Sequence, residues 1–488
     1  MPSNIRRICR LLCLLACAAP AAAAPPAEAK ISAAELQADF TQMYQDLQAA
    51  HFNLFAFTPK RDMDRRFAHM LAAIRNPSTR FQAQLRFELF AASAHMGHTR
   101  LDSPTSQWDA YRKNGGKGFP LQIRIVGQRV YVAENLSGLA SIVPGDEITS
   151  LNGQGMLRWL ERTERHVSAE TAYMAHSIME YDFAIYLWVE LGAVDGFDLA
   201  VRGKGASMRH LHLPARTAQE MLLARQSQPA MLNLEKPLRE AKLLEGHVAY
   251  LRPGPFYNAD AKTGAEEWDV SSFKAFIDDA FAGFLRAGAD RLIIDLRGNP
   301  GGDNLFSDVM VSWFATKPFR FASQFKVKVS EQSIAANAAR IAHDAEAAGP
   351  VSREYAQLYA RSRIGEIVDF PLAEALPRAD GGFTGKVFVL IDRQSYSNAV
   401  AVAALVQDYQ FGAILGEATS DMATTYGAME QFSLAHTGLL VGYPKARIVR
   451  PNGDLRSHGV APDIEIRIPV VQSPADEVLQ QARAIALR

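Results

Sequence analysis

A run of glycines follows an apolar stretch typical of a buried strand. Residues 295–302 read Asp-Leu-Arg-Gly-Asn-Pro-Gly-Gly, and Asp295 is also the last residue of the apolar stretch Leu292–Asp295. Consecutive glycines accept positive φ angles and can point successive backbone N–H groups at one place, which suits an anion. A plain strand-to-helix turn would use the same residues. The spacing matches neither the G-x-G-x-x-G of a dinucleotide site nor a phosphate-binding loop, which needs Gly-Lys-Ser/Thr.

A serine lies at the end of a second apolar run, Val387–Ile391. Residues 392–399 read Asp-Arg-Gln-Ser-Tyr-Ser-Asn-Ala, and the apolar segment 399–406 that follows predicts a buried helix. The hydroxyl of Ser397 is therefore expected at the start of that helix, where backbone N–H groups can stabilise an oxyanion. The same position is the ordinary N-cap of a helix, and spacing alone does not separate the two roles.

Composition and the remaining motifs exclude several other chemistries. Cys9, Cys13 and Cys17 are the only cysteines among 488 residues, which leaves none for a disulfide scaffold, a Cys-based zinc site or an iron–sulfur cluster in the body. His210 and His212 share one face of an expected strand, but no third ligand and no H-E-x-x-H accompany them, so we expect no metal or cofactor. With 52 basic and 52 acidic side chains, the formal charge is zero, which argues against a nucleic-acid partner.

The N-terminus is typical of an export signal. Three arginines without an acid precede an apolar stretch at 11–19 and four alanines at 21–24. This anatomy predicts a signal peptide over residues 1–24, and the apolar run is too short to span a bilayer. We therefore expect a mature protein in the bacterial periplasm or secreted, without a transmembrane span. Leu-Leu-Ala-Cys at 14–17 leaves a second interpretation open, in which a lipid on Cys17 anchors the protein.

Periodicity divides the rest of the chain into helical, strand-rich and alternating regions. Ser32–Glu35 is a capping box that precedes apolar residues at helical spacing. Strand-like alternation follows, and later strands alternate with helices, which predicts a largely parallel sheet with covering helices. The expected segments are a helical domain at 25–115, a β-rich domain at 116–216 with an inserted helix at 168–191, a linker at 217–244, an α/β core at 245–470 with a helical insertion at about 325–365, and a C-terminal helix at 471–488.

Four motifs, in this order, resemble the C-terminal-processing, or tail-specific, serine peptidases, a family that includes tricorn protease. They are the glycine run at 295–302, Ser-Tyr-Ser-Asn at 395–398, Gly-Glu-Ala-Thr at 416–419 and Gly-Val-Ala-Pro-Asp at 459–463. The resemblance implies an α+β multidomain fold with a crotonase-like α/β catalytic core. Ahead of it, residues 144–153 resemble the most recognisable stretch of a PDZ domain, which these enzymes carry in that place. An unrelated β-rich domain is the alternative.

The resemblance also implies roles for single residues. Ser397 falls at the family's nucleophile, and Ser395 is the less favoured neighbour. The N–H of Asn398, with one from Gly301 or Gly302, would form the oxyanion hole. If the leader is removed, the mature chain has no thiol, so the nucleophile has to be a hydroxyl.

The general base differs between branches of the family. The processing peptidases use a lysine after the serine, and Met422 stands at that place here, where a thioether cannot accept a proton. The tricorn-like branch uses a histidine in an upstream helical region, and His98 resembles it. Its imidazole suits general-base chemistry at neutral pH. A structural histidine at the end of the expected 81–95 helix is the alternative, and His95, expected on that helix, is the neighbouring candidate.

The acid that would orient the histidine is not evident. Related enzymes tend to carry a glutamate just before the Gly-Val-x-Pro-Asp string, and Arg456 stands there. Asp454, Glu430, Glu417 and Ser457 are the candidate substitutes, and a Ser–His dyad is the other solution.

The expected function is that of an exported serine endopeptidase of the tail-specific type, which hydrolyses peptides or unfolded protein segments through an acyl-enzyme. The PDZ-like domain would bind a peptide by strand addition. The helical domain has to fold back over the core to bring His98 within hydrogen-bond reach of Ser397. The alternative is a catalytically degenerate, peptide-binding relative of the same fold.

Overall fold

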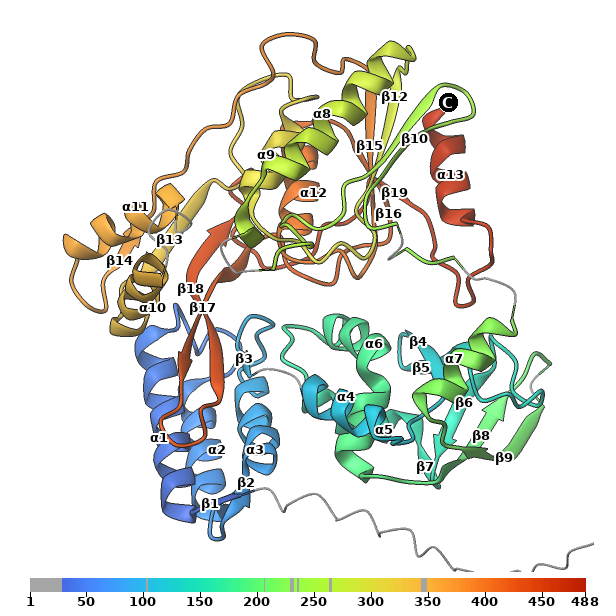
Figure 1. Ribbon diagram of the computed structural model, residues 1–488, viewed down its shortest axis with the longest axis vertical. Helices are drawn as coiled ribbons and strands as arrows, with labels where there is room; N and C mark the ends of the chain where they lie inside the picture. Colours follow the sequence, from blue (N-terminus) through green and yellow to red (C-terminus); the bar gives the residue numbers. More distant parts are fainter. Residues whose placement is uncertain are drawn as a thin grey trace, which may run out of the picture.

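The regions of different periodicity fold into a helical domain, a β-rich domain and an α/β core (Figure 1). This confirms the mixed helix-and-sheet, multidomain architecture. Within the described ranges no helix has the length and apolarity that crossing a bilayer requires. The expected signal segment and Cys17 lie outside these ranges. The computed structural model describes residues 29–101, 104–205, 207–228, 232–234, 237–262, 266–343 and 349–488.

The helical domain begins at the predicted capping box. The Oγ of Ser32 accepts from the N–H of Glu35, and the Glu35 carboxylate accepts from the N–H of Ser32 at 2.9 Å. The third helix ends at Ala92, so His95, expected on the helix, lies in the turn after it with a φ of 53°. The elements are β1 (Lys30–Ile31), α1 (Ala33–Ala50), α2 (Lys60–Ala73), β2 (Ser78–Thr79), α3 (Arg80–Ala92), β3 (Arg100–Leu101) and α4 (Thr105–Lys113).

The β-rich domain is an antiparallel sheet covered by two helices. Its strand order is β4-β5-β6-β8-β9, with β7 beside β6. Asn152 and Gly153 have φ angles of 49° and 74°, which form the turn that the Asn-Gly pair predicts. Helix α5 was not predicted, whereas α6 lies where an inserted helix was expected. The elements are β4 (Leu121–Val126), β5 (Arg129–Asn135), β6 (Glu147–Leu151), β7 (Gln154–Gly155), α5 (Met156–Glu164), α6 (Ala172–Leu191), β8 (Gly196–Arg202), β9 (Met208–Pro214) and α7 (Ala218–Gln226).

The core is built on a sheet with the order β10-β11-β12-β15-β16-β19. All neighbouring pairs are parallel except β10 with β11, and β10 lies in the segment expected as a linker. Apolar side chains of α8, α9 and α12 pack on one face, and those of α13 pack on the other. The elements are β10 (Glu240–Leu244), β11 (Val248–Arg252), α8 (Ser271–Arg286), β12 (Arg291–Asp295), α9 (Asn304–Val311), β15 (Lys386–Ile391), α12 (Asn398–Tyr409), β16 (Ala413–Gly416), β19 (Ile464–Glu465) and α13 (Glu477–Ala486).

A second sheet connects the core to the helical domain. It has the order β14-β13-β18-β17, and two helices of the expected insertion, α10 and α11, accompany it. Its elements are β13 (Gln324–Lys328), α10 (Glu331–His343), α11 (Gly349–Ala360), β14 (Ile367–Asp369), β17 (Thr425–Ser433) and β18 (Leu440–Val449).

The β17–β18 hairpin reaches into the helical domain, beside α1 (Figure 1). Its residues Leu434, Leu439 and Val441 belong to the same apolar cluster as the three helices. The carboxylate of Asp39 on α1 accepts backbone N–H groups from the hairpin turn at 2.9 and 2.7 Å. Strand β3 then pairs with β18 in antiparallel fashion. The chain just before β3, which includes His98, is therefore held against the core.

Candidate active site

The two glycine- and serine-containing loops meet because β12 and β15 are neighbouring parallel strands, whose carboxyl ends share one edge. The N–H of Gly298 donates to Asp392 Oδ1 at 3.0 Å. The N–H of Tyr396 donates to the carbonyl oxygen of Asn299 at 2.9 Å. These bonds join the loops into one unit.

Ser397 has the backbone of a strained turn between a strand and a helix. Its φ of 52° and ψ of −119° lie outside the regions that a side chain normally allows, which costs about 1–3 kcal/mol. Its side chain forms no N-cap hydrogen bond and is half-buried, so the geometry does not support the N-cap role. Ser395 is fully buried and donates to the carbonyl oxygen of Leu296 at 2.7 Å, which leaves it inaccessible to a substrate.

The glycine loop packs directly against Ser397. A Cβ atom on Gly301, whose φ is +86°, would lie 2.7 Å from Asn398 N and 2.8 Å from Ser397 Cβ. The N–H of Gly301 donates to Asn299 Oδ1 at 2.9 Å. In the described part of the chain, by contrast, the N–H groups of Gly302 and Asn398 have no acceptor. Of the two glycines, Gly302 is therefore the one with a free donor.

We expect Gly301→Ala to lower kcat/KM for peptide hydrolysis by about 10²-fold or more, because a Cβ there displaces Ser397 and the N–H of Asn398. The matched control is Gly298→Ala in the same loop. Gly298 also has a positive φ, +62°, but its Cβ would meet only Tyr181 Oη at 3.9 Å. Equal loss of activity in the two variants, measured by steady-state kinetics, would show that backbone strain and not contact with the serine is responsible.

His98 comes from the helical domain and lies against the serine loop. It is 5% exposed, and its ring stacks on that of Tyr396 with centroids 5.5 Å apart. The adjacent Thr99 bonds to both the helical and the β-rich domain. Its hydroxyl bonds to His51 Nε2 of the helical domain at 2.8 Å, and its carbonyl oxygen accepts from Ser168 of the β-rich domain at 2.6 Å. The structure thus places His98 against Tyr396, the residue before Ser397. The imidazole and the Ser397 hydroxyl form no hydrogen bond.

The surroundings of His98 set its titration. Burial lowers its pKa below the usual 6.5, the carboxylate of Asp421 acts in the opposite direction, and Arg100 lowers it further. Nδ1 of His98 is buried and has no hydrogen-bond partner among the described residues. The neutral imidazole, which can accept a proton, is therefore the favoured form at neutral pH.

The acids considered from the sequence are each paired with a cation and do not hydrogen bond to His98. Asp454 is on the surface, Glu430 is buried in the second sheet, and Glu417 faces the β-rich domain; Ser457 is exposed. Their ion pairs are Asp454–Arg456 at 2.8 Å, Glu430–Lys445 at 2.7 Å and Glu417–Arg393 at 2.6 Å.

Asp421, which the sequence reasoning missed, is the carboxylate next to the serine. It is fully buried, and its Oδ2 accepts from the N–H of Ser397 at 2.6 Å. Its Oδ1 accepts from the N–H of Met422 at 2.8 Å. Its position in the sequence could have indicated it, because Asp421 directly precedes Met422, which stands where the processing peptidases carry their lysine base.

An arginine of the serine loop ties the core to the β-rich domain. Arg393 donates to the carbonyl oxygen of Ile125 on β4 at 2.8 Å and pairs with Glu180 of α6 at 3.0 Å. Arg124 on β4 pairs with Glu180 and Glu417 at 3.0 and 2.9 Å. Because all four charges are largely buried, the network fixes the orientation of the two parts near Ser397.

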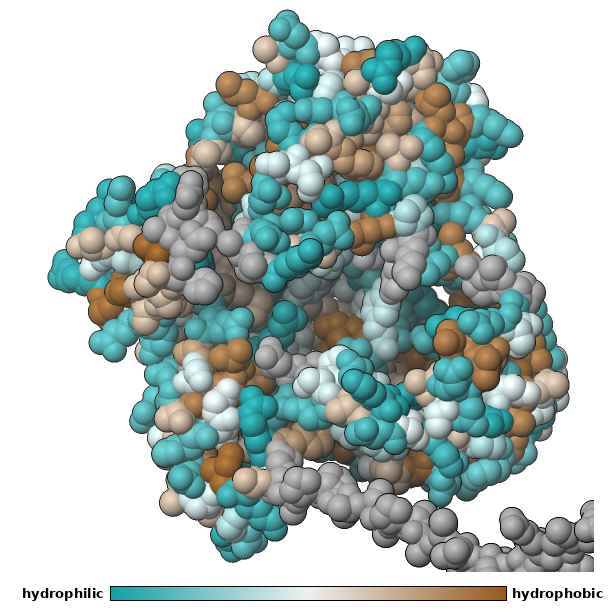
Figure 2. Space-filling model, viewed as in Figure 1, coloured by the Kyte–Doolittle hydropathy of each residue, from teal (hydrophilic) through white to brown (hydrophobic). Residues whose placement is uncertain are grey.

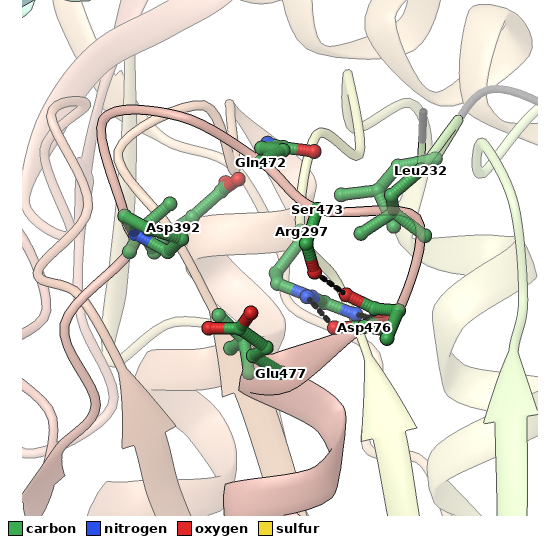
Figure 3. A pocket seen from close by; sticks show the side chains of 12 residues that line it. Leu232, Arg297, Asp392, Gln472, Ser473, Asp476 and Glu477 are labelled. Atoms are coloured by element: carbon green, nitrogen blue, oxygen red, sulfur yellow. Dashed lines mark hydrogen bonds and ion pairs between the residues drawn. The ribbon is translucent and has the colours of Figure 1, made fainter. Parts of the chain in front are cut away.

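Arg297 anchors the glycine loop to the C-terminal helix (Figure 3). It is 2% exposed and donates to Asp295 and to Asp476, each at 2.6 Å. Asp476 is also the N-cap of α13. This arginine of the glycine motif is thus a structural residue.

His210 and His212 lie on β9, where His212 Nδ1 bonds to Asp198 at 2.8 Å. Over the described ranges no three His, Cys, Asp or Glu side chains converge as a metal site would require.

A half-buried hydroxyl that caps no helix and lies beside unpaired N–H groups has the environment that acyl transfer to serine requires. This places the chain among the serine hydrolases. Residues 262–466 match the model of Peptidase family S41, and the chain is a serine-type peptidase.

Two solved structures of mature CPAF are similar to this chain in fold. The crystal structure of mature CPAF superimposes with a TM-score of 0.61 at 13% identity and covers 93% of this chain and 96% of that one. Mature CPAF complexed with lactacystin has a TM-score of 0.57 at 14% identity, with 93% and 97% covered. The photosystem II D1 C-terminal processing protease has a TM-score of 0.42 at 16% identity, with 88% and 92% covered. Curated protein sequences offer no match to the chain.

Proposed function

We propose that this protein is an exported serine endopeptidase of the tail-specific, C-terminal-processing type, which cleaves peptides or unfolded protein segments through an acyl-enzyme. The observation that carries the proposal is the strained backbone of Ser397 beside the free N–H groups of Gly302 and Asn398. A strained turn of this kind presents a serine hydroxyl to a bound carbonyl group. His98 is the proposed general base, without the lysine of other branches.

In the proposed reaction, Ser397 Oγ attacks the scissile carbonyl carbon while His98 takes its proton. The N–H groups of Asn398 and Gly302 donate to the oxyanion that forms. His98 then protonates the leaving amine, and water, deprotonated by the same imidazole, hydrolyses the acyl-enzyme. The hydrogen bond between His98 and Ser397, absent here, is of the type that often tightens only when substrate binds.

The β-rich domain is proposed to be a PDZ-like module that binds a peptide segment and delivers it. A cleft of about 400 Å³ lies between the β4–β5 turn, α5, α6 and Arg393 of the serine loop. Strand β4 is an edge of its sheet, and an edge strand can accept a further strand. On the face in Figure 2 the surface is hollowed between the core and the two other domains, which leaves room for an extended chain.

Export is proposed from the N-terminal sequence, with cleavage near residue 24. A mature protein in the periplasm or medium would then contain no cysteine, whereas a lipoprotein would retain Cys17. The intact mass of the exported protein distinguishes the two. A mass that includes residues 1–24 would overturn both versions.

Labelling with a fluorophosphonate probe tests the catalytic proposal. We expect the parent protein to be labelled and Ser397→Ala not to be labelled. Equal labelling of both would exclude Ser397 as the nucleophile. A folded parent that binds peptide but is neither labelled nor active would favour the catalytically degenerate relative.

A further inference from the structure

The loop between β16 and β17 places one carboxylate beside both members of the proposed catalytic pair. Asp421 is fully buried, and it accepts the N–H of Ser397 at 2.6 Å. His98 stacks on Tyr396, the residue before Ser397, with ring centroids 5.5 Å apart, so the same loop lies between the imidazole and this carboxylate. In agreement, Asp421 raises the pKa of His98, and His98 lowers that of Asp421. No acid in the described part of the chain hydrogen bonds to His98.

We propose that Asp421 is the positioning residue of this active site: it holds the backbone of Ser397 in its reactive conformation and supplies the negative charge that stabilises the imidazolium of His98 during proton transfer. The inference rests on the proposed function, because it assigns a role relative to Ser397 and His98. The orienting carboxylate would then come from the β16–β17 loop. Related enzymes tend to carry it as a glutamate at the position that Arg456 occupies in this chain.

The first part of the role follows from the hydrogen bonds. Ser397 has a positive φ, which a serine adopts only when its surroundings hold it there. The acceptor for its N–H is the side chain of Asp421, 24 positions further along the chain. The other carboxylate oxygen accepts from Met422 N–H at 2.8 Å, so the carboxylate itself has a fixed orientation.

The second part follows from the charges around His98. Arg100 opposes a positive charge on the imidazole, and burial keeps Tyr396, which stacks on it, neutral by raising its pKa. Glu170 lies near Asp421, but burial, together with the charge of Asp421, raises the pKa of Glu170 to about 7. Burial raises the pKa of Asp421, whereas the nearby His98 and the two N–H groups that Asp421 accepts act in the opposite direction. The charge of His98 and the two N–H groups favour the ionised carboxylate, which in turn stabilises an imidazolium in this low-dielectric site.

The test is Asp421→Asn in the full-length mature protein. Asparagine keeps an oxygen for the N–H of Ser397 and removes the charge. We expect kcat for peptide hydrolysis to fall by about 10²-fold or more, with KM little changed. The acid limb of the kcat/KM profile should move to lower pH, because the charge that raises the pKa of His98 is gone. A residue with a structural role alone would not move this limb.

Two controls separate charge at the site from other effects. Arg456→Ala removes an exposed side chain and should leave kcat and the acid limb as in the parent. Asp392→Asn removes another buried carboxylate, which accepts the N–H groups of Gly298 and Gln394. It should lower thermal stability without moving the acid limb.

The outcomes distinguish this inference from the proposed function. Parent-like kcat and acid limb in Asp421→Asn, with Ser397→Ala and His98→Ala inactive, would overturn the role of Asp421 alone. Activity retained in Ser397→Ala would overturn the proposed function instead. If Asp421→Asn does not fold, Asp421→Glu decides, because it keeps the charge but displaces it. Reduced kcat with a moved acid limb supports the proposal, whereas parent-like kcat, or reduced kcat with an unmoved limb, overturns it.

Discussion

Replacing Ser397 with alanine is expected to lower kcat for peptide hydrolysis by about 10⁶-fold, the loss typical of removing the nucleophile of a serine peptidase. The structure gives the physical reason. Ser397 is the half-buried hydroxyl on the strained turn, and the free N–H groups of Gly302 and Asn398 accompany it. Without the hydroxyl no acyl-enzyme forms, so both steady-state turnover and fluorophosphonate labelling should disappear.

The control for this variant is Ser395→Ala, two residues earlier. Ser395 is fully buried, and its hydroxyl donates to the carbonyl oxygen of Leu296. We expect Ser395→Ala to lower stability but to retain labelling at Ser397, which mass spectrometry of the labelled peptide would locate. A label on any residue other than Ser397 would contradict the assignment.

Replacing His98 with alanine is expected to have an effect of similar size, about 10⁶-fold in kcat, because a serine hydroxyl is a weak nucleophile without a base. The pH profile of the parent provides an independent check. Burial, the largest influence, lowers the pKa of His98 below its usual 6.5. The imidazole is active as a base when deprotonated, so kcat/KM should remain high at pH 6.5 and fall only at more acidic pH.

Arg100 and Asp421 are the charged groups that modify this titration. Arg100 acts in the same direction as burial, and Asp421 acts against it. His95→Ala is the matched control, because His95 lies in the turn after α3. We expect the His95→Ala variant to have parent-like activity in the same assay. An acid limb centred above pH 6.5, or His98→Ala with parent-like turnover, would contradict the role of His98 as base.

Several local features of the protein were predictable because few neighbouring residues form them. The capping box at Ser32 and the turn at Asn152 consist of hydrogen bonds and φ angles within four residues. The apolar runs before the two loops likewise predicted two buried strands, and the structure shows that these strands are neighbours. Helix α5 was missed, and its nine residues are too few to be stable without packing on the β-rich sheet.

The identity of the charge at the site was not predictable from spacing. Asp454, Glu430 and Glu417 were considered because they are acids near the motifs in sequence, and each is paired with a cation elsewhere. The position of Asp421 depends on where the β16–β17 loop passes the serine loop. The position of His98 depends on the docking of β3 against β18. Both are long-range packing outcomes that local sequence patterns do not encode.

By itself, then, the sequence determined the glycine and serine loops, the strands that precede them and the resemblance to serine peptidases, because these are written in short, contiguous motifs. Only the tertiary structure decided that Gly302 and not Gly301 has a free N–H, that Ser397 caps no helix, and that Asp421 lies beside Ser397 and His98. The physical reason is that hydrogen bonding and desolvation in an active site are set by groups that meet from different domains. Their meeting is decided by the burial of apolar surface along the β17–β18 hairpin, far from the chemistry.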